Sequence, residues 1–275
     1  MKNFLIRTIT GGIYVVLSIG CILAGRYTFL ALFSILLAYT LFEFYRLCKK
    51  GGNYPHTVPG IITALYFFIS FFIYEMQWVN ELIFLGLIPL LILTPVIELF
   101  KKSKNAAQNI AYTIFGIVYI ALPFSVLNFI ATPYSHSPEL FMPEMLIGLF
   151  ILLWANDSGA YVVGSRLGKT KMAERISPQK TWEGATGGAI LAIAVSIVFF
   201  NLVGHFNLFH SIIIGMLIVI AGTLGDLTES MMKRSFGVKD SGRLLPGHGG
   251  LLDRFDSMLF AAPVYYIYIS IILNY

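Results

Sequence analysis

The chain has 275 residues, of which 57% are hydrophobic and only 12% are charged. Average soluble domains carry about 25% charged residues, so a soluble globule of this size would lack the charge to cover its surface. The apolar content also excludes a disordered chain. The composition therefore predicts an integral membrane protein.

Nine apolar stretches are candidate membrane spans, because a helix needs about 20 mostly apolar residues to cross the hydrocarbon core. They cover approximately residues 8–25, 28–46, 58–74, 82–99, 110–130, 144–163, 185–204, 207–226 and 257–273. Too little chain remains for a separate soluble domain. We therefore predict an all-α polytopic protein of about nine transmembrane helices, folded as a single membrane-embedded domain over residues 1–275.

Lysine and arginine predict the orientation of these spans. If the N-terminus is cytoplasmic and the chain changes sides at each span, all but one of the 19 basic residues lie inside, the exception being Arg26. This bias is the positive-inside pattern of membrane proteins. We expect a cytoplasmic N-terminus and an outer C-terminus. The net charge of +5 then reflects topology rather than nucleic-acid binding.

Polar residues are distributed unequally along the chain. Residues 1–140 are predicted to form a hydrophobic scaffold half, and residues 141–275 a catalytic half with cytosolic loops at 164–184 and 227–256. In the scaffold half, Glu43 and Glu98 lie near the inner ends of their spans. We expect nearby basic residues to neutralise them, namely Arg46 for the first acid and Lys101 and Lys102 for the second.

Asp157 lies among apolar residues in the sixth span. A carboxylate at that depth costs roughly 3 kcal/mol on insertion scales unless it faces a wet cavity or a cation. We predict that it faces a binding cavity, with a helix–helix hydrogen bond as the alternative. Lys180 and Glu183 follow a turn at Ser177-Pro178 and start the seventh span. Helix-start electrostatics could explain this pair, but we place both beside the cavity.

The densest polar stretch runs from Asp226 to Asp256. If the helix of the eighth span continues past the interface, Asp226, Ser230 and Lys233 share one face. Carboxylates beside a hydroxyl and a cation could hold a divalent metal and a phosphate. Asp253 and Asp256 lie three apart in the first turn of the next helix. That spacing suits oxygen ligation of Mg²⁺, with helix capping as the alternative.

A glycine-rich segment, residues 245–250, comes directly before that helix. Its three glycines let the backbone approach a ligand closely, and the free amides of a helix start favour an anion. His248 is either polar filler or a functional group. The candidate site is completed by further cations and glycines of this region, namely Arg234, Lys239, Arg243, Gly249, Gly250 and Arg254.

These residues carry a family resemblance. Ser230-x-x-Lys233-Arg234, Lys239-Asp240 and Pro246-Gly247-His248-Gly249-Gly250-x-x-Asp253-Arg254-x-Asp256 together resemble the signature of the phosphatidate cytidylyltransferase (CDP-diacylglycerol synthase) family. Ser177-Pro178-x-Lys180-Thr181-x-Glu183-Gly184 is similar to an upstream motif of that family. The resemblance implies a membrane enzyme, usually dimeric, that makes CDP-diacylglycerol and pyrophosphate from CTP and phosphatidate. It also implies Mg²⁺, with K⁺ as a candidate second ion, and a metal-binding cluster of Asp226, Asp253 and Asp256.

The expected roles follow. Candidate catalytic residues are Asp226, Lys233, Arg234, Lys239, Asp253 and Asp256. Candidate substrate-binding residues are Asp157, Lys180, Glu183, Ser230, Arg243, His248, Gly249, Gly250 and Arg254. A phosphomonoester has a second pKa near 6, so the lipid phosphate needs no general base. It needs cations and metal to approach a nucleotide.

Two other functions remain open. One is a lipid or polyprenol kinase that uses CTP or ATP. The other is an anion or phospholipid transporter, which would carry polar residues through the outer half of its late spans. Residues 190–200 and 266–273 are apolar instead. We expect a homodimer in a bacterial inner membrane, with the lipid bilayer, CTP and phosphatidate as partners and the active site facing the cytoplasm.

Overall fold

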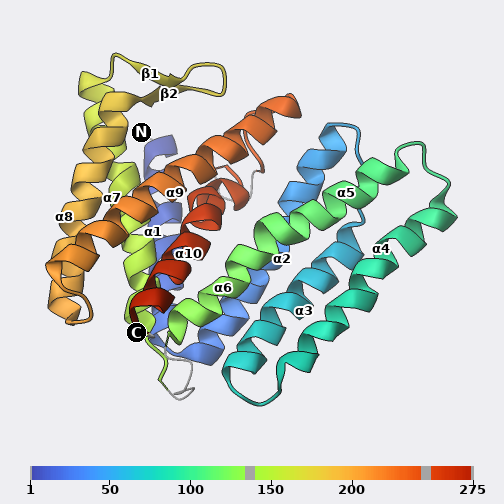
Figure 1. Cartoon of the computed structure of the whole chain (residues 1–275). Helices are drawn as coiled ribbons and strands as arrows, with labels where there is room; N and C mark the ends of the chain where they lie inside the picture. The colour runs from blue at the N-terminus through green and yellow to red at the C-terminus, as the bar shows by residue number, and fades with distance from the viewer. Residues whose placement is uncertain (1, 134–139, 243–248, 274–275) are drawn as a thin grey trace.

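The computed structural model describes residues 2–133, 140–242 and 249–273, with side chains from Thr10 onward. Figure 1 shows a helical bundle with a small β-hairpin at one end and the C-terminus at the other. The elements are α1 (Lys2–Leu23), α2 (Arg26–Lys50), α3 (Thr57–Glu75), the 3₁₀ helix η1 (Glu81–Gly86), α4 (Leu87–Lys101), α5 (Ala106–Gly116), the π-helix η2 (Ile117–Ala121), α6 (Leu122–Ala131), α7 (Pro143–Leu167), β1 (Lys171–Ala173), β2 (Ser177–Thr181), α8 (Trp182–Val203), α9 (Leu208–Ser235) and α10 (Leu252–Leu273).

Within the described part of the chain, eight helical segments are long and apolar enough to cross a membrane. They correspond to the second to ninth predicted spans, so the all-α polytopic class is confirmed. The first predicted span, 8–25, coincides with α1. Its apolar described part, Thr10–Leu23, is shorter than the other eight.

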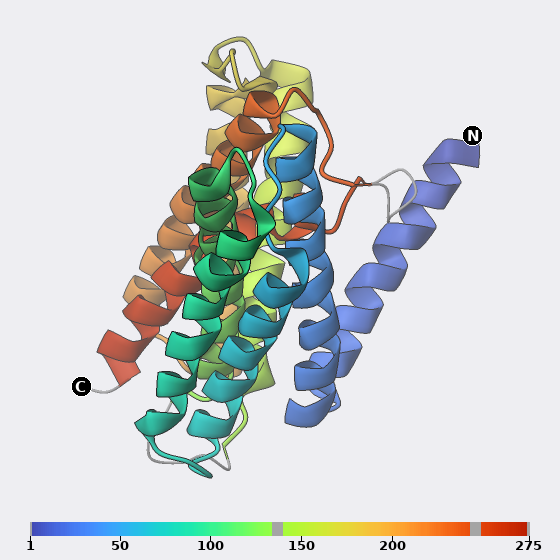
Figure 2. The ribbon, with the colours of Figure 1, turned by 90° about the vertical axis from the view of Figure 1, so that its right-hand side faces the viewer.

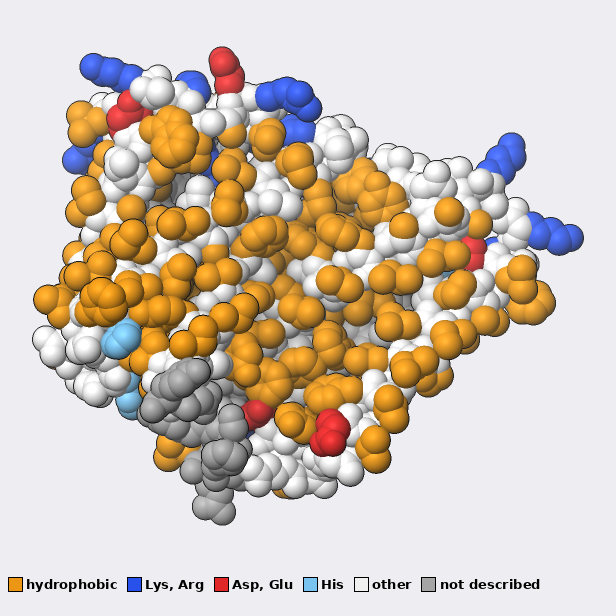
Figure 3. All heavy atoms as spheres, viewed as in Figure 1, with side chains coloured by type: hydrophobic (Ala, Val, Ile, Leu, Met, Phe, Trp, Pro, Cys, Tyr) orange, Lys and Arg blue, Asp and Glu red, His pale blue; other side chains and the backbone are white. Residues whose placement is uncertain are grey.

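The outer surface of the bundle is apolar. Leu99, Phe100 and Leu202 are 76%, 79% and 82% exposed. Figure 3 shows hydrophobic side chains across the middle of the visible face, with Lys and Arg at the hairpin end and beyond the α4–α5 turn. Apolar patches of this extent are rare on soluble monomers. The surface therefore matches a multi-pass protein embedded in a bilayer.

One local structure differs from the sequence prediction. Residues 171–181 form an antiparallel hairpin, in which Lys171 pairs with Thr181 and Ala173 with Ser177, where a simple turn was expected. Helix α9 continues nine residues beyond the apolar stretch that ends at 226, and α10 begins five residues before the stretch that starts at 257, so Ser230 and Lys233 lie on α9 and Asp253 and Asp256 in the first turn of α10, as their spacing indicated. Hydropathy marks where apolar side chains stop, whereas these helices continue into the polar end of the bundle.

A widened helical turn, η2, joins α5 to α6. It lies just before Pro123, which has no amide hydrogen to donate to the preceding turn. A π-helical turn is one way in which a helix absorbs such a defect. The backbone therefore continues as one long apolar segment, Ala106–Ala131.

Helices α7 and α8 pack unusually closely through glycines. A Cβ atom on Gly159 would lie 2.9 Å from backbone atoms of Gly187 and Gly188. A Cβ on Gly164 would lie 3.3 Å from the Cα of Gly184. Small residues that let helix backbones approach are typical of membrane interfaces. The start of α8 therefore lies within backbone contact distance of α7 at Gly184 and Gly188.

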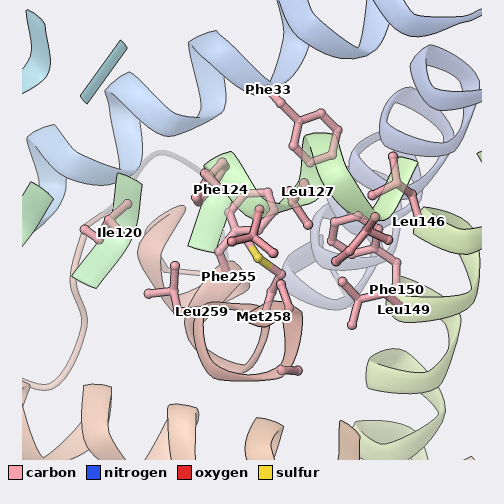
Figure 4. Close-up of a cluster of buried hydrophobic side chains, with 14 of the residues drawn as sticks. Phe33, Ile120, Phe124, Leu127, Leu146, Leu149, Phe150, Phe255, Met258 and Leu259 are labelled. Atoms are coloured by element: carbon pink, nitrogen blue, oxygen red, sulfur yellow. The ribbon is translucent and has the colours of Figure 1, made fainter. Parts of the chain in front are cut away.

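A cluster of buried hydrophobic side chains includes Phe255, Met258 and Leu259 from the first turns of α10 (Figure 4). Phe255 of α10 lies 5.0 Å from Phe124 of α6 between ring centroids. Phe33 of α2 and Phe150 of α7 lie 5.9 Å apart in the same cluster. Phe255 stands between Asp253 and Asp256 in the sequence. The buried Phe255 side chain therefore anchors the first turn of α10 in the core, whereas Asp253 and Asp256 lie on other sides of the same turn.

Candidate active site

A polar cavity of about 560 Å³ lies where α7, α8, α9 and α10 meet the hairpin. Its volume is within the range of about 300–1,000 Å³ found for small-molecule sites. The cavity brings together three residues that the sequence placed in the site, Asp157 from α7, Lys180 from β2 and Asp226 from α9. Its other polar lining side chains are Asn156, Tyr161, Ser165, Ser177, Gln179, Thr181, Thr223 and Ser257.

An ion pair closes one side of this cavity. The Nζ of Lys180 lies 2.6 Å from Oδ2 of Asp226, and both side chains keep about a quarter of their surface exposed, 26% and 28%. The hydroxyl of Ser230 donates to the other oxygen of Asp226 at 3.2 Å. The pair therefore joins the hairpin to α9, and its charged groups remain accessible from the cavity.

A second charged cluster surrounds Lys233 and is more buried than the Lys180–Asp226 pair. The ammonium of Lys233 lies 2.6 Å from Oδ1 of Asp253 and also pairs with Glu229, one helical turn earlier on α9. The Glu229 side chain is only 1% exposed. Sequence analysis did not select Glu229, although its i, i+4 spacing to Lys233 was a signal for an ion pair. The Lys233 ammonium therefore forms ion pairs with both Glu229 and Asp253.

Asp253 holds the segment that leads into α10. Its carboxylate accepts hydrogen bonds from the amide and hydroxyl of Ser241, at 3.1 and 2.8 Å, and from the amide of Gly250 at 2.7 Å. Gly249 has a φ of +81°, a conformation that favours glycine. None of these donors is an amide of α10 itself, so the contacts tie Ser241 and Gly250 to the helix start rather than cap the helix, and the metal-ligand interpretation of Asp253 stays a prediction.

Glu43 of α2 reaches the same segment from the other half of the chain. It is 1% exposed, and its Oε2 accepts the amide of Leu252 at 2.9 Å and lies 3.5 Å from the Ser241 hydroxyl. The predicted pairing with Arg46 is wrong, since Glu43 forms no ion pair with any described residue. The partial positive charge at the start of α10 takes the place of that cation.

Glu98 also has a different partner from the one expected. Its Oε2 lies 2.7 Å from Nε2 of His56, and both side chains are buried. Lys101 contacts the other ring nitrogen of His56 at 3.1 Å rather than Glu98 itself. Asn109 donates to Glu98 at 2.8 Å. This network fastens the segment between α2 and α3 to α4 and α5.

A smaller cavity of about 200 Å³ lies between α1, α7 and α10. It contains Arg254 and Asp256, two further residues of the predicted site. It shares Asp157 and Ser257 with the main cavity, so these two residues stand at the boundary between both spaces. Its remaining lining side chains are Tyr14, Val15, Phe150, Leu153, Trp154, Asp253 and Met258.

Three carboxylates around this boundary repel one another electrostatically, namely Asp157, Asp226 and Asp256. Lys180 and Arg254 partly offset the charge of Asp157. Across the described ranges, no three His, Cys, Asp or Glu side chains converge closely enough to ligate one metal ion. Carboxylate oxygens are the kind of ligand that Mg²⁺ prefers, so the donor type of this set suits a divalent cation, although Asp226 is engaged by Lys180 and the three carboxylates do not converge on one point.

Other predicted residues lie away from the main cavity. Arg234 donates to the backbone carbonyls of Ile176 and Val238, at 3.2 and 3.3 Å, and so ties α9 to the hairpin. Glu183 accepts the amides of Lys169 and Thr170 at 3.1 Å and secures the turn before β1. Neither side chain lines either cavity.

Lys239 lies in a separate hollow of about 460 Å³, together with Arg46 and Lys50 of α2. Two other candidates, Arg243 and His248, fall outside the described residues. Among the described residues, the structure thus places Asp157, Lys180 and Asp226 in one cavity, Arg254 and Asp256 in its neighbour, and Lys233 and Asp253 in the cluster between α9 and α10.

The fold and this site define a class, the polytopic membrane proteins whose cavity of paired carboxylates and cations lies at one end of an apolar bundle. Comparison with known proteins identifies the family. The Cytidylyltransferase family matches residues 5–272. A phosphatidate cytidylyltransferase of Staphylococcus saprophyticus is 36% identical over 262 residues, which cover 94% of this chain and 96% of the relative.

Two further relatives agree. A phosphatidate cytidylyltransferase of Haemophilus influenzae is 42% identical over 187 residues, or 64% of each chain. One of Staphylococcus aureus is 31% identical over 262 residues, or 94% of this chain and 96% of the relative. The chain therefore belongs to the phosphatidate cytidylyltransferase family, and the resemblance inferred from the sequence motifs is confirmed. It is an enzyme, a nucleotidyltransferase of the membrane.

Proposed function

We propose that this enzyme transfers the CMP group of CTP to phosphatidate and releases CDP-diacylglycerol and pyrophosphate. The observation that carries the proposal is the 560 Å³ cavity in which Asp157 and the Lys180–Asp226 pair face one another. It supplies both the negative charge to hold a metal ion and the positive charge to hold phosphates. The names of the relatives supply the substrates.

The reaction forms one bond and breaks one. An oxygen of the lipid phosphate bonds to the α-phosphorus of CTP. The bond between that phosphorus and the oxygen that it shares with the β-phosphate breaks. The electron pair leaves with pyrophosphate. Transfers of this kind depend mainly on positioning and charge stabilisation rather than on a general base.

Each group of the site has a part in this scheme. Lys180 steadies the phosphates of the nucleotide in the main cavity, and its ion pair with Asp226 sets its position. Lys233 holds Asp253 and therefore the start of α10 in place. Ser241 and Gly250 are fixed by the same carboxylate.

Magnesium belongs to the proposal as the cofactor. Among the predicted ligands, Asp226 lines the main cavity and Asp253 and Asp256 line the smaller one, with Asp157 as a further carboxylate shared by both. Asp253, the third predicted ligand, is engaged by Lys233, Ser241 and Gly250. When bound, Mg²⁺ would neutralise the phosphate oxygens as negative charge develops on pyrophosphate.

The hairpin end of the bundle is proposed to face the cytoplasm of a bacterial inner membrane. Its Lys and Arg side chains, visible in Figure 3, are those expected on the inner side by the positive-inside rule. CTP would then reach the main cavity from the cytosol. Homodimer formation and K⁺ binding stay predictions of the family resemblance.

One assay tests the proposal against its rivals. Purified protein is incubated with phosphatidate, Mg²⁺ and CTP labelled at either the α- or the γ-phosphate. Label from the α-phosphate in the lipid, with γ-label in pyrophosphate, is the expected result. Transfer of the γ-label to lipid would instead identify a kinase, and no transfer of either label would refute both enzymes.

A further inference from the structure

A hollow of about 460 Å³, separate from both cavities, lies where the C-terminal end of α2 meets the stretch that follows α9. Its charged lining consists of three cations and one carboxylate, namely Arg46, Lys50, Lys239 and Asp240. None of these residues lines the main or the smaller cavity. The proposed reaction therefore gives Lys239 no role, although it belongs to a sequence motif that predicted a site residue.

The positive charge of this hollow is not balanced by the protein. Across the described residues, none of the three cations forms an ion pair. All three residues are exposed. Basic residues in the last turn of a helix offset its dipole, which accounts for Lys49 and Lys50 of α2. It does not account for Lys239, which comes from another element and lines the same hollow.

The lining suits a phosphate group. A guanidinium binds phosphate through two parallel hydrogen bonds, and an ammonium adds a point charge. The hollow lies at the end of a candidate membrane span, Arg26–Lys50. Figure 2 shows the C-terminal end of α2, in blue, at the same end of the bundle as the hairpin. Basic residues at the end of a span attract anionic lipid head groups, and the volume also admits a small soluble anion.

An anion in the hollow would connect two elements that already meet at Glu43. On α2, Glu43 lies one turn before Arg46, and its Oε2 lies 3.5 Å from the Ser241 hydroxyl. Ser241 follows Lys239 by two residues, and its amide and hydroxyl donate to Asp253. A ligand held by cations of both elements would therefore fix the stretch after α9 against α2.

We propose that this hollow is a binding site for the phosphate group of an anion. Arg46, Lys50 and Lys239 hold the phosphate, and the bound anion fastens residues 239–242 to α2. Two sources supply this chemistry, the head group of an anionic membrane lipid and a free phosphate in solution. The site shares no residue with the two cavities of the proposed reaction, so the inference does not depend on that function.

Thermal stability tests the site without any measurement of turnover, because a ligand that binds the native state raises Tm. The full-length protein in neutral detergent is titrated separately with dihexanoyl-phosphatidylglycerol, dihexanoyl-phosphatidylcholine and sodium phosphate at constant ionic strength. We expect a rise in Tm with at least one of the two anions and none with the zwitterionic lipid. A rise with phosphatidylglycerol alone assigns the site to a lipid head group, and a rise with sodium phosphate assigns it to free phosphate as well. No rise with either anion, or an equal rise with phosphatidylcholine, overturns the proposal.

A matched pair of variants locates the binding. Arg46→Gln/Lys50→Gln removes two cations of the hollow, whereas Lys49→Gln/Lys104→Gln removes the same charge from exposed positions outside its lining. We expect the half-saturating anion concentration to rise at least about tenfold in the first variant and to change less than about twofold in the second. Equal effects in both variants, or none in the first, overturn the proposal. If the double variant does not fold, Lys50→Gln alone gives the same test with an expected rise of about threefold.

Amide hydrogen exchange tests the fastening of the stretch to α2. At saturating anion, the amides of residues 239–242 should exchange at least about threefold more slowly in the wild type, because opening of this stretch then requires release of the ligand. The protection should be lost in Arg46→Gln/Lys50→Gln and kept in Lys49→Gln/Lys104→Gln. Unchanged exchange in the wild type at saturating anion would overturn the proposed fastening.

Discussion

Replacement of Glu43 by alanine probes a contact that joins the two halves of the chain. The carboxylate accepts the Leu252 amide at 2.9 Å and lies beside the Ser241 hydroxyl. Gly242 and Gly250 also pack against it so closely that a Cβ on either would collide with its oxygens. The substitution therefore removes a common anchor of Ser241–Gly242 on one side and Gly250–Leu252 on the other.

The size of the effect follows from these contacts. A buried amide left without its acceptor costs about 1–3 kcal/mol, with charged acceptors toward the upper end. A loss of about 2 kcal/mol in holding this segment lowers the equilibrium constant for its ordered state by a factor of about 30, which is the upper limit of the loss in competent population. A typical domain has about 5–15 kcal/mol of stability, so the variant should still fold.

The assay compares kcat/KM for CTP and the Tm of purified Glu43→Ala, Glu43→Gln and wild type. We expect a loss of up to about 30-fold for alanine and a smaller loss for glutamine, which keeps an acceptor oxygen. The matched control is Glu98→Ala, which removes another buried carboxylate of the same half whose partners are His56, Ser103 and Asn109. It should lower Tm but leave kcat/KM of the folded enzyme near wild type. Wild-type kcat/KM in Glu43→Ala would refute the reasoning.

Three further predictions concern stability. Lys233→Met leaves its two carboxylate partners unpaired and should destabilise the protein by about 3–5 kcal/mol, measured as a lower Tm. Gly250→Ala should cost about 1–3 kcal/mol, because a Cβ has no room there, whereas Gly20→Ala, with nothing within 4 Å, should be neutral or stabilising. Burial and the ammonium of Lys101 lower the pKa of His56 below its ordinary value, so the stabilisation by its neutral form is complete above a pH of about 6.5 and is lost as the pH falls further. Tm should therefore drop between about pH 7 and pH 5, and His56→Gln should flatten that dependence; equal slopes would contradict it.

Hydropathy carried most of the fold prediction because each span is a local property of the sequence. Length and apolar content placed eight long segments correctly. The hairpin at 171–181 escaped because it is short and polar, and so has no alternating pattern. Hydropathy alone marks only the apolar parts of α9 and α10, and the spacing of their polar residues was needed to extend both helices beyond those parts.

The arrangement of the candidate site could be predicted only where its residues lie close together in one sequence motif. Asp226, Ser230 and Lys233 share a helix face, as their spacing indicated. Glu43 and Leu252 are 209 residues apart, and nothing in a linear pattern connects them. Conversely, Arg234 looked like a phosphate ligand because it is basic and adjacent to Lys233. In the structure its guanidinium donates to the backbone carbonyls of Ile176 and Val238, contacts that the linear pattern did not indicate.

The most direct test of the account is the rate at which α-labelled CTP labels phosphatidate in wild-type protein and in Asp226→Asn, with both matched by Tm. Asn keeps the size of the side chain but removes the charge that pairs with Lys180. The account predicts CMP transfer by the wild type, with one pyrophosphate per lipid labelled, and at least about a hundredfold loss in Asp226→Asn. Near-normal transfer by Asp226→Asn, or none by the wild type, would contradict it.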